Sequence, residues 1–372
     1  MDRLELLPML RGAYMAALGC PVIVHSAEDG RLDIPELAFP LSDVGLRTLG
    51  RPGGRLPVAV RVEGGGSFYV GRDWEEAERA AGMPSGELFA PPDSGNTRLG
   101  AVEGKVILIT GGARGLGAEI ARGLVDQGAF VIIADINLEG AREQADALNL
   151  LGPHRAEAVE VDVSNELSIR RMAEKVVLCA GGVDVLISNA GVLRAGSVLE
   201  QTTADFDFVT RINYSAFFLL VKQMASILVR QRLTNQGYSS DIIQINSKSG
   251  LVGSNKNAAY AGGKFGGIGL VQSFALELIE YGIKVNAICP GNLFDGLLWS
   301  DPDSGLFVQY LKAGKVPGAR TVADVREFYE EKVPMGRGCE SKDVLRAILY
   351  CVEQQYETGQ AVPVTGGQVM LG

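Results

Sequence analysis

Short apolar runs alternate with amphipathic stretches over most of the chain after residue 102. Runs such as "KVILIT" and "FVIIAD" are continuously apolar, whereas "GLGAEIARGLVDQG" between them has helical periodicity. Continuous apolar runs are typical of strands buried on both faces. Strands that alternate with helices form right-handed βαβ units. The pattern predicts the α/β class: a doubly wound parallel sheet, or Rossmann fold. The predicted strands are 105–110, 130–135, 156–163, 183–191, 240–247 and 283–291.

The first hundred residues have a different pattern. Strand-like runs are shorter there, and the glycines 64–66 between "PVAVRV" and "SFYVG" predict a hairpin. Asp73 followed by Glu76 is typical of a helix N-cap pair. The stretch "GELFAPPDSGNTRLG" is rich in Pro, Gly and small polar residues and indicates a linker. We therefore expect a small α+β region at 1–98 and a Rossmann-fold domain at 99–372.

Composition narrows the class of protein. The chain has 372 residues, of which 47% are hydrophobic, so a large core is possible. Its formal net charge of -9 disfavours general binding to nucleic acid or to an anionic membrane. No bilayer-spanning apolar run and no Lys-led signal peptide are evident. Five scattered cysteines and two histidines do not support a disulfide framework or a metal site. We expect a soluble protein of the reducing cytoplasm.

A glycine-rich turn, "TGGARGLG", follows the first predicted strand of the large domain. Glycine is needed where the backbone takes unusual dihedral angles and where a pyrophosphate approaches the main chain. The helix that follows presents free N–H groups to the phosphates. The turn therefore predicts a dinucleotide site. The expected contacts are Gly111, Ala113, Arg114, Gly115, Leu116 and Gly117.

Acidic residues at strand ends bear on the choice of cofactor. Asp135 ends the second predicted strand, 18 residues after Gly117. A carboxylate there can accept hydrogen bonds from the ribose hydroxyls of NAD and repel the extra phosphate of NADP. Arg114 could instead meet that phosphate, but we favour NAD. Asp162 and Val163 end the third strand, and Asp162 either contacts the adenine or caps the next helix.

Three polar residues farther along could form a catalytic set. Tyr260 and Lys264 are four residues apart, so on a helix they share one face. An ammonium beside a phenol lowers the phenol's pKa from about 10. The phenolate could remove an alcohol proton while hydride leaves the same carbon. Ser247, at the end of a strand, could hydrogen-bond the reacting oxygen.

These residues resemble the motifs of the short-chain dehydrogenase/reductase family, over residues 103–372. The matching motifs are Thr110-Gly111-x3-Gly115-x-Gly117, Asn189-Ala190-Gly191, Ser247, Tyr260-x3-Lys264 and Pro290-Gly291. The resemblance implies cofactor contacts by Asn189, Ala190, Gly191, Tyr260, Lys264, Pro290 and Gly291. It also implies that Asn213 is a catalytic residue that holds a helix bulge and a proton-relay water; an ordinary capping or packing role is the alternative. The usual threonine after Pro-Gly is missing from "GNLFDG", so Asn292 or backbone groups would have to hold the nicotinamide amide.

Within the family the chain is similar to polyol-phosphate dehydrogenases, through "IIQINSKSGLVGS", "EKVPMGRGC" and "VTGGQVM". That similarity implies an NAD-dependent homo-oligomer, a dimer or tetramer, that interconverts sorbitol 6-phosphate and fructose 6-phosphate. The candidate substrate contacts are Ser247, Lys248, Lys256, Arg194 and Asn292. Two alternatives stay open: a dehydrogenase of an unphosphorylated sugar, polyol or other secondary alcohol, and an NAD-sensing binding protein.

Overall fold

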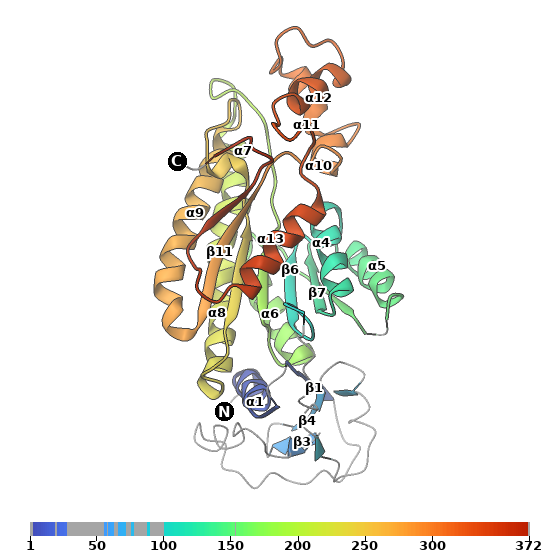
Figure 1. The fold of residues 1–372 in the computed structure, drawn as a ribbon, viewed down its shortest axis with the longest axis vertical. Coiled ribbons are helices and arrows are strands. Elements are labelled where there is room, and N and C mark those ends of the chain that lie inside the picture. Colours follow the sequence, from blue (N-terminus) through green and yellow to red (C-terminus); the bar gives the residue numbers. More distant parts are fainter. Residues whose placement is uncertain are drawn as a thin grey trace.

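The computed structural model describes residues 3–18, 21–27, 56–57, 59–62, 66–71, 76–77, 88–89, 100–152 and 154–370. Its main feature is a seven-stranded sheet in the order β12-β11-β10-β9-β6-β7-β8, in which every pair of neighbours is parallel (Figure 1). The strands are β6 (Val106–Thr110), β7 (Phe130–Asp135), β8 (Ala156–Glu160), β9 (Val185–Ser188), β10 (Ser240–Ile245), β11 (Ile283–Pro290) and β12 (Ala361–Val364). The predicted doubly wound parallel sheet is confirmed.

Helices cover both faces of the sheet because each has one apolar side. One face carries α6 (Glu166–Ala180), α8 (Ala216–Thr234) and α9 (Ala258–Leu278). The other carries α4 (Gly115–Asp126), α5 (Leu138–Asn149) and α13 (Ser341–Glu353). The central strands are buried throughout, as their continuous apolar runs predict.

A smaller helical unit lies beyond the carboxyl ends of the strands. It contains α10 (Leu297–Ser300), α11 (Leu306–Lys312) and α12 (Val322–Glu330), which appear at the top of Figure 1. Aromatic rings form its separate core, with Trp299 packed edge-on against Phe294 and Tyr310. This unit therefore stands on the side of the sheet where ligands bind in doubly wound folds.

The N-terminal region forms α1 (Arg3–Leu18) and a three-stranded sheet of β1 (Ile23–Ala27), β4 (Gly66–Gly71) and β3 (Ala59–Val62). The predicted hairpin is confirmed in the described residues, since β3 and β4 pair antiparallel from Val62 and Gly66 onward. A further pair joins β2 (Leu56–Pro57) to β5 (Leu88–Phe89). Asp73 of the predicted cap pair and the predicted boundary near residue 98 lie outside the described residues, so both stay predictions.

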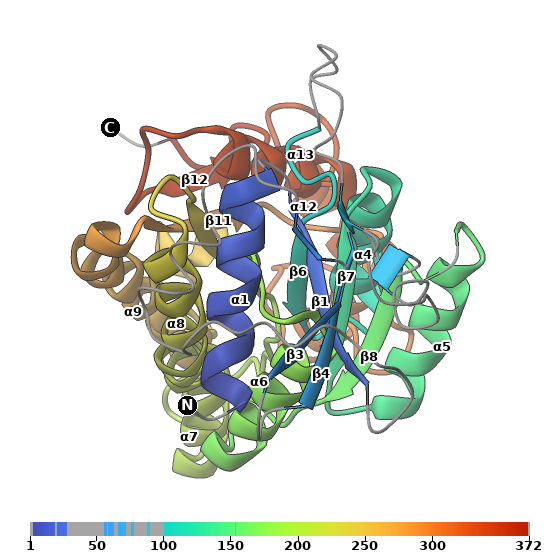
Figure 2. The same ribbon diagram turned by 90° about the horizontal axis from the view of Figure 1, so that it is seen from below.

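Helix α1 covers the amino end of the main sheet and contacts α8 and α6 (Figure 2). Arg11 donates two hydrogen bonds to Asp184, both 2.7 Å long, and neither side chain is exposed. Asp184 directly precedes β9 and also accepts the backbone N–H of Val106, the first residue of β6. The N-terminal region is therefore joined to the core of the main sheet rather than packed on its outer surface.

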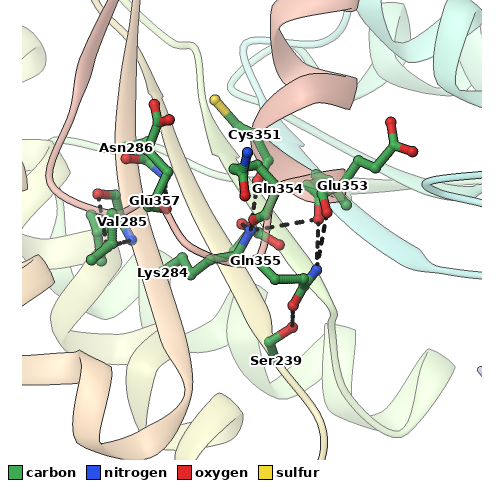
Figure 3. A network of polar contacts seen from close by, with 12 residues as sticks. Ser239, Lys284, Val285, Asn286, Cys351, Glu353, Gln354, Gln355 and Glu357 are labelled. Carbon is green, nitrogen blue, oxygen red and sulfur yellow. Dashed lines mark hydrogen bonds and ion pairs between the residues drawn. The ribbon is translucent and has the colours of Figure 1, made fainter.

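A buried lysine joins the middle of the sheet to the end of α13. Lys284 of β11 is 3% exposed and lies 3.0 Å from Asp241. Its ammonium donates to the carbonyls of Cys351, at 2.6 Å, and of Gln354, at the end of α13 (Figure 3). A cation satisfies carbonyls that a helix end leaves unpaired. This contact ties α13, and with it the turn into β12, to the middle of the sheet.

Among the described residues, one helix has the length and composition of a membrane span. It is the continuous helix 203–234, with a mean hydropathy of 1.4 over its most apolar window. The expectation that no such run exists was therefore wrong. Its buried residues, including Phe217, Leu220 and Met224, belong to the core shared with the sheet and α1.

Candidate active site

The glycine-rich turn between β6 and α4 has the geometry of a cradle. Gly111 and Gly115 have φ angles of 67° and 57°, a region that favours glycine. A Cβ on Gly117 would lie 2.1 Å from the carbonyl oxygen of Gly111, so the helix can approach the turn only through a glycine. No side chain caps α4, because Arg114 at its N-cap makes no capping hydrogen bond. The first N–H groups of α4 can therefore meet an anionic group, as a dinucleotide pyrophosphate requires.

Asn189 fixes this turn from the neighbouring strand. Its Nδ2 donates to the carbonyls of Thr110, at 3.0 Å, and Gly111, at 3.1 Å. Its backbone N–H and that of Ala190 both donate to the hydroxyl of Thr110. The motif Asn189-Ala190-Gly191 thus builds the cradle. Its predicted contact with the cofactor itself stays a prediction.

Asp135 lies half-buried at the end of β7, beside the turn. Its Oδ2 accepts the N–H of Ala113 at 3.1 Å, and its Oδ1 accepts that of Asn137 at 3.0 Å. A carboxylate has about four acceptor positions, so capacity remains for ribose hydroxyls. Arg114 is exposed, and Leu116 is half-buried in the first turn of α4.

Asp162 does not cap the next helix, contrary to the alternative raised from the sequence. Its Oδ1 accepts from the N–H and the hydroxyl of Ser164, at 2.9 and 2.7 Å. The cap of α6 is Asn165, which accepts from the N–H groups of Leu167 and Ser168. Val163 beside it is buried. The adenine contact of Asp162 and Val163 stays a prediction.

Ser247, Tyr260 and Lys264 come together at the carboxyl end of β10. Ser247 follows the strand, and its hydroxyl lies close enough to the phenol of Tyr260 to affect the pKa of that phenol. Lys264 lies one turn farther along α9, with Nζ 5.7 Å from the centroid of the Tyr260 ring. The same Nζ donates to the carbonyl of Ile245 at 2.8 Å. The three residues form one cluster, as their spacing predicts.

Burial governs the ionisation of this cluster. It raises the pKa of Tyr260 above its ordinary value, although the Ser247 hydroxyl acts in the opposite direction. It lowers the pKa of Lys264 to about 8. The expectation that Lys264 lowers the pKa of Tyr260 is therefore wrong for the chain without ligands. Burial of the phenol is the largest cause of the shift, and the Lys264 ammonium is directed at the Ile245 carbonyl instead.

Asn213 lies in a π-helical turn, Arg211–Ser215, between α7 (Thr203–Thr210) and α8. Its side chain is 3% exposed and makes two hydrogen bonds to the backbone of Val192, at 2.9 and 2.7 Å. A Cβ on Gly191 would lie 3.2 Å from its Oδ1. The helix bulge implied by the resemblance is present, whereas the proton-relay role stays a prediction.

Asn292 carries an unsatisfied donor beside the predicted nicotinamide position. It is 5% exposed, and its Nδ2 has no hydrogen-bond partner among the described residues. Pro290 ends β11, and Gly291 donates to the carbonyl of Val364 at 2.9 Å, which fixes the backbone here. A buried amide without a partner is costly, so Asn292 fits a ligand that supplies an acceptor.

The predicted substrate contacts separate into two groups. Lys248 and Lys256 each interact electrostatically with Lys315, and Lys248 also interacts with Lys332; sequence reasoning missed Lys315 and Lys332. No local motif marks the missed pair, which belongs to the small helical unit. Arg194 is instead ion-paired with Asp205 of α7 and lies 4.4 Å from the centroid of the Phe208 ring. These contacts do not support the predicted contact of Arg194 with a substrate.

Comparison with known proteins places this geometry in a family. The family model of short chain dehydrogenases matches residues 105–297. Sorbitol-6-phosphate 2-dehydrogenase of Escherichia coli (strain K12) is 36% identical over 271 residues, which are 72% of this chain and 99% of that protein. The chain belongs to the short-chain dehydrogenase family. Sorbitol dehydrogenase of Cereibacter sphaeroides is 33% identical over 271 residues, with the same coverage.

Solved structures agree with the assignment to the short-chain dehydrogenases. Sorbitol-6-phosphate 2-dehydrogenase from Erwinia amylovora superimposes with a TM-score of 0.66 at 37% identity and covers 71% of this chain and 100% of its own. An actinorhodin polyketide ketoreductase with NADPH gives 0.62 at 28% identity, over 71% of this chain and 97% of its own. The chain is thus an oxidoreductase acting on alcohol groups, in a family that uses NAD or NADP.

Proposed function

We propose that this short-chain dehydrogenase uses NAD to interconvert a hexitol 6-phosphate, with sorbitol 6-phosphate as the first candidate, and fructose 6-phosphate. The cluster of Ser247 beside Tyr260, with Lys264 one helical turn away, is the observation that carries the proposed chemistry. The choice of substrate is supported by the similarity to two sorbitol-6-phosphate 2-dehydrogenases along their whole length. A cytoplasmic homo-oligomer, a dimer or tetramer, belongs to the same proposal.

The residues divide the reaction between them. NAD, when bound, supplies the acceptor for the hydride that leaves C2 of the alcohol. The phenolate oxygen of Tyr260 takes the hydroxyl proton, so the C–O bond becomes a carbonyl. Ser247 donates a hydrogen bond to the reacting oxygen and orients it toward Tyr260. Lys264, when protonated, favours the phenolate electrostatically.

The choice of NAD rests on Asp135. Its carboxylate lies at the end of β7 beside the glycine cradle, where ribose hydroxyls would meet an acceptor and a 2′-phosphate would meet a like charge. Asn292 would hold the nicotinamide amide through its unpartnered Nδ2. NADP is the alternative, since Arg114 is exposed in the cradle and one solved relative is titled with NADPH.

A substrate panel tests the proposal. Reduction of NAD and of NADP should be followed with sorbitol 6-phosphate, other hexitol 6-phosphates and the matching unphosphorylated hexitols. The proposal expects the highest kcat/KM with NAD and a phosphorylated hexitol. Comparable values for the two kinds of alcohol would favour a polyol dehydrogenase, which the similarity to a sorbitol dehydrogenase also supports. Tight NAD binding without turnover of any alcohol would favour an NAD-sensing protein.

A further inference from the structure

Four lysines from three connecting segments gather beside the catalytic helix. Lys248 directly follows Ser247, and Lys256 lies two residues before α9, in the same connection. Lys315 follows α11, and Lys332 follows α12. Lys248 interacts electrostatically with Lys332, and Lys315 does so with the other three. Residues far apart in the sequence therefore bring like charges to one place.

Direct contacts connect this group to the active site. Lys256 Nζ donates to the carbonyl of Ala313 at 2.6 Å, two residues before Lys315. Lys315 Nζ lies 3.8 Å from the centroid of the Tyr310 ring. With the Asn257 amide oriented to satisfy both its ends, its oxygen accepts from Lys315 Nζ at 3.2 Å and from the Tyr310 hydroxyl at 3.0 Å. Tyr310 in turn lies close enough to Tyr260 for the two phenols to interact electrostatically.

Nothing described in the chain neutralises these charges. Among the described residues, other lysines do form ion pairs, such as Lys222 with Glu166 and Lys284 with Asp241, but none of the four does. Burial, followed by repulsion from the neighbouring lysines, lowers the pKa of Lys248 and of Lys315 to about 8. Gathering like charges in one place costs free energy, although the chain as a whole has a net charge of -9.

The backbone of Lys256 has an unusual conformation that bears on its positioning role. Its φ of 57° lies in the left-handed region, where glycine would be less strained, and among the described non-glycine residues only His154 shares this property. A lysine at such a position indicates that its side chain is needed there. Its hydrogen bond to Ala313 joins the loop before α9 to the segment that carries Lys315.

We infer that Lys248, Lys315 and Lys332 form the site for a dianionic phosphate monoester, the phosphate end of the substrate, and that Lys256 positions this site. The inference rests on the proposed function for the identity of the ligand. Lysine is a compact charge that suits a phosphate on a flexible carbon chain. The pyrophosphate of a dinucleotide is a different ligand. Its predicted site lies at the start of α4, which follows β6, and strand β9 separates β6 from β10 in the sheet.

Three variants of the full-length enzyme test the site: Lys315→Met, Lys332→Met and, as the matched control, Lys312→Met. Lys312 is exposed at the end of α11 and takes part in none of these contacts. The readout is the ratio of kcat/KM for sorbitol 6-phosphate to that for sorbitol. Loss of a charge-assisted hydrogen bond should lower this ratio about 10- to 100-fold in the first two variants and leave it unchanged in the control. Lys332→Arg should restore most of it.

Three further results would each overturn the inference or limit it to an anion site. The KM for NAD should not change in any variant; a parallel rise would assign the lysines to cofactor phosphate and overturn the inference. Equal losses for both alcohols would show that the lysines only support the loops.

If the wild-type enzyme oxidises no hexitol phosphate, the proposed function fails. Calorimetry with inorganic phosphate then decides whether the lysines bind an anion. If inorganic phosphate binds the wild-type enzyme but neither Lys315→Met nor Lys332→Met, the inference of an anion site is supported. If phosphate does not bind, or binds the variants as well as the wild-type enzyme, that inference is wrong.

Discussion

Burial acts in opposite directions on the two titrating side chains of the active site. It raises the pKa of the Tyr260 phenol and lowers that of the Lys264 ammonium to about 8. The active pairing, phenolate beside ammonium, is therefore disfavoured in the chain without ligands.

The lysine site predicts a specific pH dependence. Lys248 and Lys315 have pKa values lowered to about 8, so in the free enzyme they are charged below that pH and neutral above it. Only the charged form attracts a phosphate dianion, which itself exists above about pH 6. The kcat/KM ratio of sorbitol 6-phosphate to sorbitol should thus be highest just below pH 8 and fall above it. The titration of Tyr260 cancels in this ratio. A ratio that stays constant from about pH 7 to 9.5 would contradict the prediction.

Asp135 should determine the choice between cofactors. Asp135→Ala removes a hydrogen-bond acceptor and a charge that repels a 2′-phosphate. In steady-state assays with each cofactor, the kcat/KM for NAD should fall, and the ratio of kcat/KM for NADP to that for NAD should rise. A wild-type enzyme that prefers NADP would contradict this and direct attention to Arg114.

The turn between β6 and α4 depends on a contact that has no room for a side chain. Gly117→Ala would place a Cβ 2.1 Å from the Gly111 carbonyl oxygen and 2.6 Å from Asn189 Nδ2. Overpacking of this kind costs about 1–3 kcal/mol, and here it would displace the cradle itself. The Kd for NAD, measured by fluorescence titration, should rise about tenfold or more. Gly262→Ala, on the exposed side of α9 with nothing within 4 Å, is the control and should keep the affinity.

Elements with a strong local pattern were predictable, and those set by tertiary contacts were not. The six predicted strands and the Gly-rich turn follow from apolar runs and glycine spacing. Strand β12 was missed because it is a half-exposed edge strand that contains Pro363. The catalytic cluster was predictable because Tyr260 and Lys264 share one helix face. Lys315 and Lys332 were not, since only the packing of the small helical unit brings them to Lys248.

At the scale of the whole molecule, a buried ion pair joins the N-terminal region to the sheet. Arg11 holds the pKa of Asp184 below its ordinary value, although burial acts to raise it. A lowered folded-state pKa contributes stability above the unfolded value of about 3.9, and this stability is lost as the pH falls through the folded value. The junction should therefore weaken only in strong acid.

Breaking this pair should be costly. Arg11→Met removes the ion-pair partner of a buried carboxylate, which keeps only its hydrogen bonds from Val106 and Tyr238 among the described residues. Such a loss typically costs about 3–5 kcal/mol of unfolding free energy. Urea denaturation should show this loss. Arg230→Met is the control, because Arg230 joins α8 to Glu5 of α1 through a half-exposed pair at 3.0 Å. Such pairs contribute about 0–1 kcal/mol. Equal small losses in both variants would contradict the assigned role of Arg11.

Removal of the N-terminal region should have a larger effect. A chain that begins near residue 100 lacks Arg11 and the apolar residues of α1, among them Leu6, Leu7 and Leu10, that share one core with the sheet. It should be insoluble or melt well below the full-length protein in a thermal scan. A folded and active truncated protein would show that the region is dispensable.

The turnover of Tyr260→Phe with NAD and sorbitol 6-phosphate, measured beside the wild-type enzyme, decides whether this site performs the proposed reaction. The substitution removes the oxygen that accepts the alcohol proton and keeps the ring, so the Kd for NAD should change little. Loss of a general base lowers kcat about 10²- to 10⁴-fold. The expected result is therefore a wild-type enzyme that reduces NAD with this alcohol and a variant that binds NAD but barely turns over. A variant that keeps more than about a tenth of the wild-type kcat would contradict the assignment of Tyr260 as the base.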